Sequence, residues 1–400
     1  MPEAVIVATG RTPIGRANKG SLVTCRPDDL TAHVVTEVLA KVPQLDPAQI
    51  EDLIVGCGQP AGEAGYNVGR VAALLAGLDV PGVTVNRYCS SSLQTVRMAA
   101  HAIRAGEGDV FVAAGVETVS RYRNGAADTG PHNESFADAE ARTVERTPAT
   151  GAPWTPLDGL PDVYIAMGQT AENVAEFKKV SRESQDEFAF QSQTRAVAAQ
   201  EAGFFDREII PVTTPDGTVV TKDDGPRAGT TLEGLSGLKP VFREGGTVTA
   251  GNACPLNDGA AAVVVMSDTK ARELGITPLA RIVASGVTGL NPEIMGLGPV
   301  EAIRQTLARA GMTIADIDLV EINEAFAAQV IPSYTDLGVD ISKLNVNGGA
   351  IAVGHPFGMT GARIATTLLN SLQFHDATLG LETMCVGGGQ GMAMIFERLS

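Results

Sequence analysis

The chain has 400 residues, of which 44% are hydrophobic and only 4% aromatic, and its formal net charge is −16. This length allows one large core or two medium ones, and an aliphatic core suits parallel sheets covered by helices. The acidic balance, without a basic run, argues against nucleic acid or an anionic membrane as a partner. The chain opens into a strand-like run at residues 4–8 and has no long apolar segment, so we expect a cytoplasmic protein.

The first half alternates between strand-like and helical patterns. Apolar positions at helical spacing predict a helix over residues 30–42, and residues 48–55 lead into a strand. A short strand at 83–86, a helix starting near Ser90 and a strand at 109–115 follow. Strands that alternate with helices in this way predict a layered α/β domain.

The composition changes between residues 121 and 246. The stretch up to residue 162 is polar, and residues 181–202 then form a predicted helix with Gly203 as its stop. The whole segment is too long for an ordinary loop. We therefore expect a lid or subdomain that contributes to substrate recognition.

The second half repeats the pattern of the first. Residues 48–55 (AQIEDLIV) and 315–322 (ADIDLVEI) are close variants, and the predicted helix before 315–322 ends at Gly311. A strand at 344–347, a helix through 364–372 and a strand at 377–383 complete the match. Such a duplication predicts two equivalent domains whose corresponding strand ends meet in the middle.

The repeat also sets the expected domain limits. We expect an N-terminal core half over residues 1–120, an inserted lid over 121–250 and a C-terminal core half over 251–400. Residues 251–275 are expected to complete the N-terminal sheet.

The five cysteines are widely scattered and none forms a Cys-x-x-Cys pair: Cys25, Cys57, Cys89, Cys254 and Cys385. This spacing is poor material for a disulfide framework or a zinc site, so we expect reduced thiols and no metal. Cys89 lies between a predicted strand and a predicted helix. The positive end of the helix dipole is expected to lower the pKa of this thiol, although an inert buried cysteine is the alternative.

His355 lies in a glycine-rich loop, residues 347–358, at the position that corresponds to Cys89 in the other repeat. A lone histidine is more often structural, but this equivalence brings the imidazole towards the thiol. A histidine beside a cysteine is the arrangement that activates a thiol nucleophile.

Two further segments carry polar groups at strand ends. Cys385 leads into Gly387, Gly388 and Gly389, whose backbone N–H groups could form an oxyanion hole or simply a crowded turn. Asn323 follows another strand, where it could position a ligand or cap a helix.

Taken together, these segments resemble the thiolase family over nearly the whole chain. The nucleophile box (residues 85–91), the Asn-Glu-Ala-Phe box (323–326), the Gly-His-Pro box (354–356) and the Cys-x-Gly-Gly-Gly box (385–389) occur in family order. Further matches are residues 167–173, 249–252 and 257–260. The resemblance implies a duplicated, five-layered αβαβα core with an inserted loop domain, coenzyme A as substrate and no permanently bound cofactor.

The resemblance also implies roles for individual residues. Cys89 would accept the acyl group, His355 would activate it, and Cys385 would act as the acid/base at the α-carbon. Asn323, through a water, and His355 would hold one thioester oxygen, while the backbone N–H groups of Cys89 and Gly387 would hold the other. The implied substrate and coenzyme A contacts are Met167, Arg227, Phe242, Ala250, Cys254 and Phe326, with Arg227 near the nucleotide end.

Four residues at three sites depart from the family pattern. Ser92 stands where a glycine is common, and Cys254-Pro255 replaces a Ser-Gly pair, which puts hydrogen bonding to pantetheine in doubt. Ala166 stands where the biosynthetic acetoacetyl-CoA enzymes usually carry a histidine. The last departure favours a degradative, β-oxidation-like 3-ketoacyl-CoA thiolase.

Three alternatives remain beside the degradative enzyme. They are a biosynthetic acetoacetyl-CoA thiolase, a decarboxylating ketoacyl synthase and a non-catalytic acyl-CoA or lipid carrier. Cys385 in place of a second histidine disfavours the synthase, and the presence of all three reactive side chains disfavours the carrier. The family is usually dimeric or tetrameric, so a homo-oligomer is expected.

Overall fold

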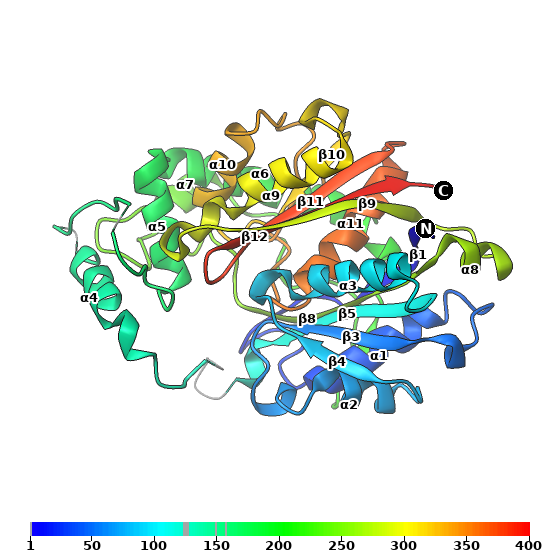
Figure 1. Ribbon diagram of the computed structural model, residues 1–400. Helices are drawn as coiled ribbons and strands as arrows, with labels where there is room; N and C mark the ends of the chain where they lie inside the picture. The colour runs from blue at the N-terminus through cyan, green and yellow to red at the C-terminus, as the bar shows by residue number, and fades with distance from the viewer. Residues whose placement is uncertain (1, 123–127, 149, 157) are drawn as a thin grey trace.

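The computed structural model describes residues 2–122, 128–148, 150–156 and 158–400. Two sheets enclose a central pair of helices, and further helices cover the outer face of each sheet (Figure 1). The predicted five-layered αβαβα arrangement is therefore confirmed. Among the described residues, no helix is both long and apolar enough to cross a membrane.

The first sheet combines strands from the first half of the chain with one strand that follows the inserted segment. Its strand order is β1 (Ala4–Arg11), β8 (Asn257–Ser267), β5 (Val110–Thr118), β3 (Asp52–Cys57) and β4 (Gly82–Val85), with the two-residue β2 (Gly15–Arg16) beside β8. β5, β3 and β4 are parallel, and β8 runs antiparallel to its neighbours. Helices α1 (Pro27–Leu39) and α2 (Val68–Leu75) share an apolar core with its outer face.

The second sheet has the order β9 (Ala280–Gly289), β12 (Gln390–Arg398), β11 (Leu379–Val386) and β10 (Leu319–Ile322). Helices α9 (Gly298–Ala310) and α10 (Ala327–Thr335) pack on its outer face. The two sheets meet where β1 pairs with β9 through Val5 and Ile6. A short helix, α8 (Asp268–Glu273), connects β8 to β9 along the chain, and its Ala271 joins the outer core of the first sheet.

The central layer consists of α3 (Ser91–Ala105) and α11 (Thr360–Phe374), which are buried between the sheets. Their first turns touch, because a Cβ atom on Gly361 would lie only 2.2 Å from the backbone nitrogen of Leu93. The Ser92 hydroxyl also accepts a hydrogen bond from the Ala362 N–H at 2.8 Å. The unusual Ser92 therefore links the two helices, and each helix begins a few residues after a predicted catalytic side chain.

The inserted segment carries α4 (Ala137–Arg146), α5 (Met167–Lys178), α6 (Arg182–Glu201), β6 (Val212–Thr213), β7 (Val219–Val220) and α7 (Leu232–Ser236). Glu293 of the second half anchors it, because the buried carboxylate accepts hydrogen bonds from Arg146 at 2.8 Å and Trp154 at 2.7 Å. Parts of the predicted lid, residues 123–127, 149 and 157, lie outside the described residues. The domain limits stay predictions.

Local signals predicted most helices correctly but one strand wrongly. The Ser181 side chain caps α6, and Gly203 ends it with a φ of +70°. The strand expected at residues 344–347 is only an isolated bridge between Val320 and Leu344. Asn345 adopts a left-handed φ of +44°, because its side chain bonds both the N–H and the C=O of Ile322 at 2.9 Å.

Two buried carboxyl groups lie side by side in the second sheet. Glu321 of β10 is in register with Glu382 of β11, and the buried Arg363 of α11 contributes the nearby positive charge. Both carboxylate oxygens of Glu382 lack a hydrogen-bond partner among the described residues. Burial raises the pKa of Glu321 from 4.5 to about 8, against the opposing effect of Arg363.

This pair predicts a specific pH dependence of stability. Glu321 ionises in the unfolded chain near pH 4.5 and in the folded chain only near pH 8, so stability is lost as the pH rises between these values. Glu321→Gln cannot ionise. Between about pH 6 and pH 8 we therefore expect the wild type to lose about 2 kcal/mol more unfolding free energy than the variant.

Urea unfolding at the two pH values measures this difference. Glu301→Gln, on the exposed face of α9, is the matched control and is expected to follow the wild type. Equal pH slopes for the wild type and Glu321→Gln would show that Glu321 is already ionised in the folded chain.

Candidate active site

Cys89 lies in the short helical turn η3 (Tyr88–Ser90) between β4 and α3. The residue before it, Tyr88, has a left-handed φ of +42°, which makes the turn sharp. Cys89 is 8% exposed, and the backbone N–H groups of Gly387 and of Cys89 itself lie close enough to its sulfur to act against the effect of burial on the thiol pKa. The turn after β11 therefore contributes directly to the surroundings of Cys89.

The expectation of a lowered thiol pKa is wrong. Burial raises the pKa of Cys89 to about 11, and the two backbone N–H groups offset only part of this shift. At neutral pH the free thiol is therefore protonated, and a base has to remove its proton when it attacks.

Two other thiols lie near Cys89. Cys385 at the end of β11 is fully buried, and Cys254 is partly exposed and packs against the same apolar cluster. Burial raises the pKa of both thiols, and the charges of neighbouring cysteines raise them further. The Cys254 backbone N–H donates to the Ala325 carbonyl at 3.0 Å, so this loop is fixed against the segment that contains Asn323.

His355 is buried, and its ring is held from more than one side. Its Nδ1 lies 2.6 Å from the Thr360 hydroxyl, and the Asn323 side-chain nitrogen lies 3.5 Å from Nδ1 and 3.4 Å from Nε2. Burial lowers the pKa of His355 to about 3, and the charge of Arg363 acts in the same direction. The imidazole is therefore neutral at physiological pH, and one of its ring nitrogens carries a free lone pair.

Asn323 does not cap a helix, since α10 begins at Ala327 with Phe326 as its N-cap. Its backbone N–H donates to Thr383 of β11 at 3.0 Å, which places it beside the strand that ends in Cys385. The Asn323 side-chain oxygen is buried and has no hydrogen-bond partner among the described residues. It is therefore available to a water molecule or a ligand.

The glycines after Cys385 divide into two groups. Gly388 and Gly389 have φ values of +75° and +79° and form the turn into β12. Gly387 instead lies beside the Tyr88 side chain, and its N–H is near the Cys89 sulfur. The segment is thus both a tight turn and a source of a hydrogen-bond donor.

Glu117 at the end of β5 connects the two halves beneath the site. Its buried carboxylate accepts the backbone N–H of Gly58 and that of Gly358, each at 2.8 Å. Gly358 belongs to the same loop as His355. The histidine loop is therefore fixed relative to the sheet that carries Cys89.

A cavity of about 670 Å³ reaches Cys254, while Cys89, His355, Cys385 and Asn323 are not among its lining residues. Four predicted contacts line it: Arg227, Phe242, Ala250 and Cys254. Arg16 also lines it and was not predicted, because the fold alone brings this residue close to Arg227. The two guanidinium groups supply positive charge in a protein of net charge −16.

The two remaining predicted contacts, Met167 and Phe326, do not line the cavity but lie behind it. Both belong to the apolar cluster that includes Cys385, and the Phe326 ring packs edge-on against Phe242 at a centroid distance of 6.0 Å. They therefore support the wall between the cavity and the buried thiol.

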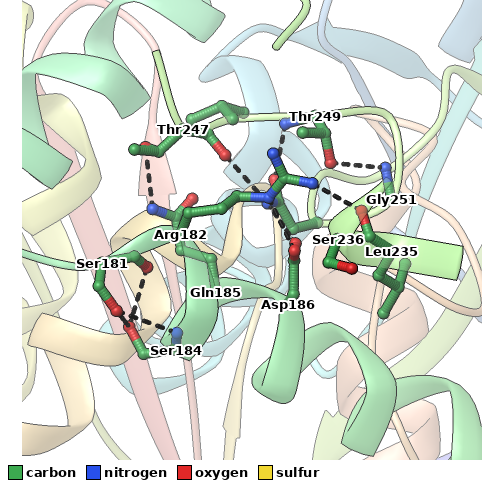
Figure 2. Close-up of polar contacts among 12 residues, drawn as sticks. Ser181, Arg182, Ser184, Gln185, Asp186, Leu235, Ser236, Thr247, Thr249 and Gly251 are labelled. Carbon is green, nitrogen blue, oxygen red and sulfur yellow. Dashed lines mark hydrogen bonds and ion pairs between the residues drawn. The ribbon is translucent and has the colours of Figure 1, made fainter. Parts of the chain in front are cut away.

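The loop that carries Ala250 is held by polar contacts from α6 (Figure 2). Gln185 of α6 donates to the Thr247 hydroxyl at 2.9 Å, and Asp186 accepts from the Asn252 side chain at 2.9 Å, while Arg182 ties α6 to the Leu235 carbonyl of α7 at 2.6 Å. One wall of the cavity thus rests on a rigid helix. Among the described residues, no group of His, Cys, Asp and Glu side chains is arranged to hold a metal ion.

Comparison with known proteins agrees with this geometry. The family model "Thiolase, N-terminal domain" matches residues 4–269, and "Thiolase, C-terminal domain" matches residues 276–398. The chain is 46% identical to a 3-ketoacyl-CoA thiolase of Cronobacter sakazakii and 44% identical to a beta-ketoadipyl-CoA thiolase of Acinetobacter baylyi, each over the full length of both chains.

A solved structure of a related enzyme has the same fold. The acetyl-CoA acetyltransferase of Bacillus anthracis superposes with a TM-score of 0.85 at 40% identity, over 100% of this chain and 99% of that one. Family models that cover almost the whole chain, together with relatives at this level of identity, establish that the protein is an enzyme of the thiolase family, an acyltransferase.

Proposed function

We propose that the protein cleaves 3-ketoacyl-CoA with free coenzyme A, giving acetyl-CoA and a shortened acyl-CoA, and that Cys89 is the nucleophile. The observation that carries this proposal is a buried, protonated Cys89 thiol in a sharp turn between β4 and α3, near the backbone N–H groups of Gly387 and Cys89 itself. A neutral imidazole and a second buried thiol complete the set.

In the first half-reaction, His355 takes the proton of Cys89 and the sulfur attacks the keto carbonyl carbon. The bond between the α- and β-carbons breaks, the acyl group stays on Cys89, and the α-carbon leaves as the enolate of acetyl-CoA. Cys385 gives this carbon a proton. The enolate is stabilised in a site from which water is excluded, with Asn323 (through a bound water) and His355 as donors to its oxygen.

In the second half-reaction, coenzyme A replaces acetyl-CoA. Its thiol loses a proton to Cys385 and attacks the acyl-cysteine, and the N–H groups of Cys89 and Gly387 hold the developing oxyanion. The sulfur of Cys89 leaves and takes back the proton that His355 has held since the first half-reaction. The cycle therefore returns both cysteines to their starting state and needs no cofactor.

We further propose that coenzyme A lies in the 670 Å³ cavity, with its phosphates near Arg227 and Arg16 and its pantetheine arm along Phe242 and Cys254. Two neighbouring cations are unfavourable without an anion between them, which supports a phosphate site there. Met167 and Phe326 shape the inner end of this channel, and Ala250 leaves room beside it.

A spectrophotometric assay tests the reaction and its chain-length preference. We expect loss of the enolate absorbance when 3-ketoacyl-CoA and coenzyme A are mixed with the enzyme. For a degradative enzyme, kcat/KM should be higher with substrates of six or more carbons than with acetoacetyl-CoA, across a series from four to sixteen carbons and one bulky substrate.

Two other outcomes would change the assignment. A kcat/KM that is highest for acetoacetyl-CoA would favour the biosynthetic alternative, and the Bacillus anthracis relative is itself named an acetyl-CoA acetyltransferase. Binding without turnover would favour an acyl-CoA carrier and would contradict the proposal.

We also propose a cytoplasmic homo-oligomer. Reduced thiols are required by the mechanism, and a reducing compartment maintains them. The edge strand β4 is only partly buried, and Tyr66 together with Leu74 and Leu75 of α2 expose large apolar surfaces near it. Light scattering of the purified protein tests this, and a monomer would contradict it.

A further inference from the structure

The imidazole of His355 has a short side-chain contact that the mechanism above does not use. Its Nδ1 lies 2.6 Å from the hydroxyl oxygen of Thr360, the first residue of α11, and both residues are buried. The backbone N–H of His355 is bound separately, by the Asn257 side chain at 2.9 Å. Backbone and ring are thus fixed by different groups.

The direction of the ring contact follows from counting hydrogens. A threonine hydroxyl has one hydrogen to donate. Thr360 donates it to the Pro356 carbonyl at 2.7 Å, which is the i−4 carbonyl of its own chain. Towards His355 the hydroxyl can therefore only accept, so the hydrogen between the two groups belongs to Nδ1.

A neutral imidazole carries one N–H, so a hydrogen on Nδ1 leaves Nε2 as the only acceptor of the ring. Asn323 does not select one of the two tautomers, because its side-chain nitrogen is almost equally distant from both ring nitrogens. The choice of tautomer then depends on Thr360.

We propose that Thr360 is a positioning residue that holds His355 in the tautomer with hydrogen on Nδ1, so that Nε2 is the base for Cys89. This inference rests on the proposed role of His355. Thr360 itself does not touch the reacting atoms. It acts through the ring, and Pro356 orients its hydroxyl.

The variants Thr360→Val and Thr360→Ser separate the hydroxyl from the space it fills. Valine removes the acceptor, whereas serine restores it. Thr366→Val is the control, because Thr366 is equally buried in α11 and donates to its own i−4 carbonyl, that of Ala362, at 2.8 Å. It therefore loses the same type of bond away from His355.

Two readouts decide the proposal. In ¹⁵N NMR of histidine-labelled enzyme, with His355 assigned by its loss in His355→Gln, we expect the Nδ1–H tautomer in the wild type, Thr360→Ser and Thr366→Val. In Thr360→Val this tautomer should no longer dominate. We also expect kcat of Thr360→Val to fall by on the order of 10²- to 10⁴-fold with a smaller change in KM, as for other bases held in the wrong tautomer.

The outcomes distinguish this inference from the proposed function. An Nε2–H tautomer in the wild type, or a Thr360→Val enzyme with wild-type kcat, would overturn the role of Thr360 and leave the thiolase reaction intact. If Thr360→Val and Thr366→Val lose the same activity and the same Tm, the effect is merely structural and the inference fails. Full activity after loss of Cys89 would instead contradict the proposed function.

Discussion

Replacing Cys89 with alanine is expected to reduce thiolysis by roughly 10⁴-fold or more, as when other covalent nucleophiles are removed. The substitution deletes the atom that carries the acyl group, and the other two reactive side chains cannot take its place. Steady-state thiolysis measures the loss. Mass spectrometry after mixing with acetyl-CoA should find no acetylated protein.

The control for Cys89→Ala is Cys25→Ala, which removes another buried thiol from the outer core of the first sheet. Its rate should match the wild type. Substantial thiolysis by Cys89→Ala would show that the acyl group travels by another route.

Replacing Cys385 with alanine should separate the two halves of the chemistry. Acetylation of Cys89 by acetyl-CoA breaks only a carbon–sulfur bond, so mass spectrometry should still detect one acetyl group per chain. The exchange of α-protons and carbon–carbon bond cleavage both need the missing acid/base. Both rates are expected to fall by about 10²- to 10⁴-fold.

Equal losses of acetylation and of proton exchange in Cys385→Ala would contradict the proposed acid/base role of Cys385. Such a result would mean that Cys385 supports the fold around Cys89 and does not handle the proton. Cys385→Ser provides a further check, since a serine keeps the shape but is a much weaker acid than a thiol. It should acetylate normally and exchange slowly.

The spacing of apolar residues in the sequence located most helices and strands, because each element buries one face and its apolar residues recur with the period of that element. The helices at 181–202 and after Pro299 have clear stops at Gly203 and Gly311, and both glycines adopt the positive φ that such stops require. The strand predicted at 344–347 failed for a tertiary reason. The left-handed Asn345 is stabilised by bonds to a strand more than twenty residues earlier.

For the candidate site, too, the sequence indicated some features and missed those that depend on the tertiary structure. The boxes located Cys89, His355 and Cys385, yet the pKa of Cys89 was predicted in the wrong direction. The nearby helix start is visible in the sequence, but the degree of burial is not. Arg16 was missed because nothing near it in the chain relates it to Arg227. The sequence did not indicate Thr360, because its proposed role depends on the distance between its hydroxyl and Nδ1 of His355 and on which acceptor receives the hydroxyl hydrogen.

The close approach of Gly361 to Leu93 has a consequence for how this enzyme can change. The thiol and the imidazole lie just before two helices whose first turns pack against each other, and that contact leaves no room for a Cβ atom at position 361. Thr230 and Leu238 line the proposed coenzyme A cavity outside these two helices, so substitutions there need not move either helix. The packing of the two central helices therefore constrains substitution, whereas the wall of the cavity can change more freely.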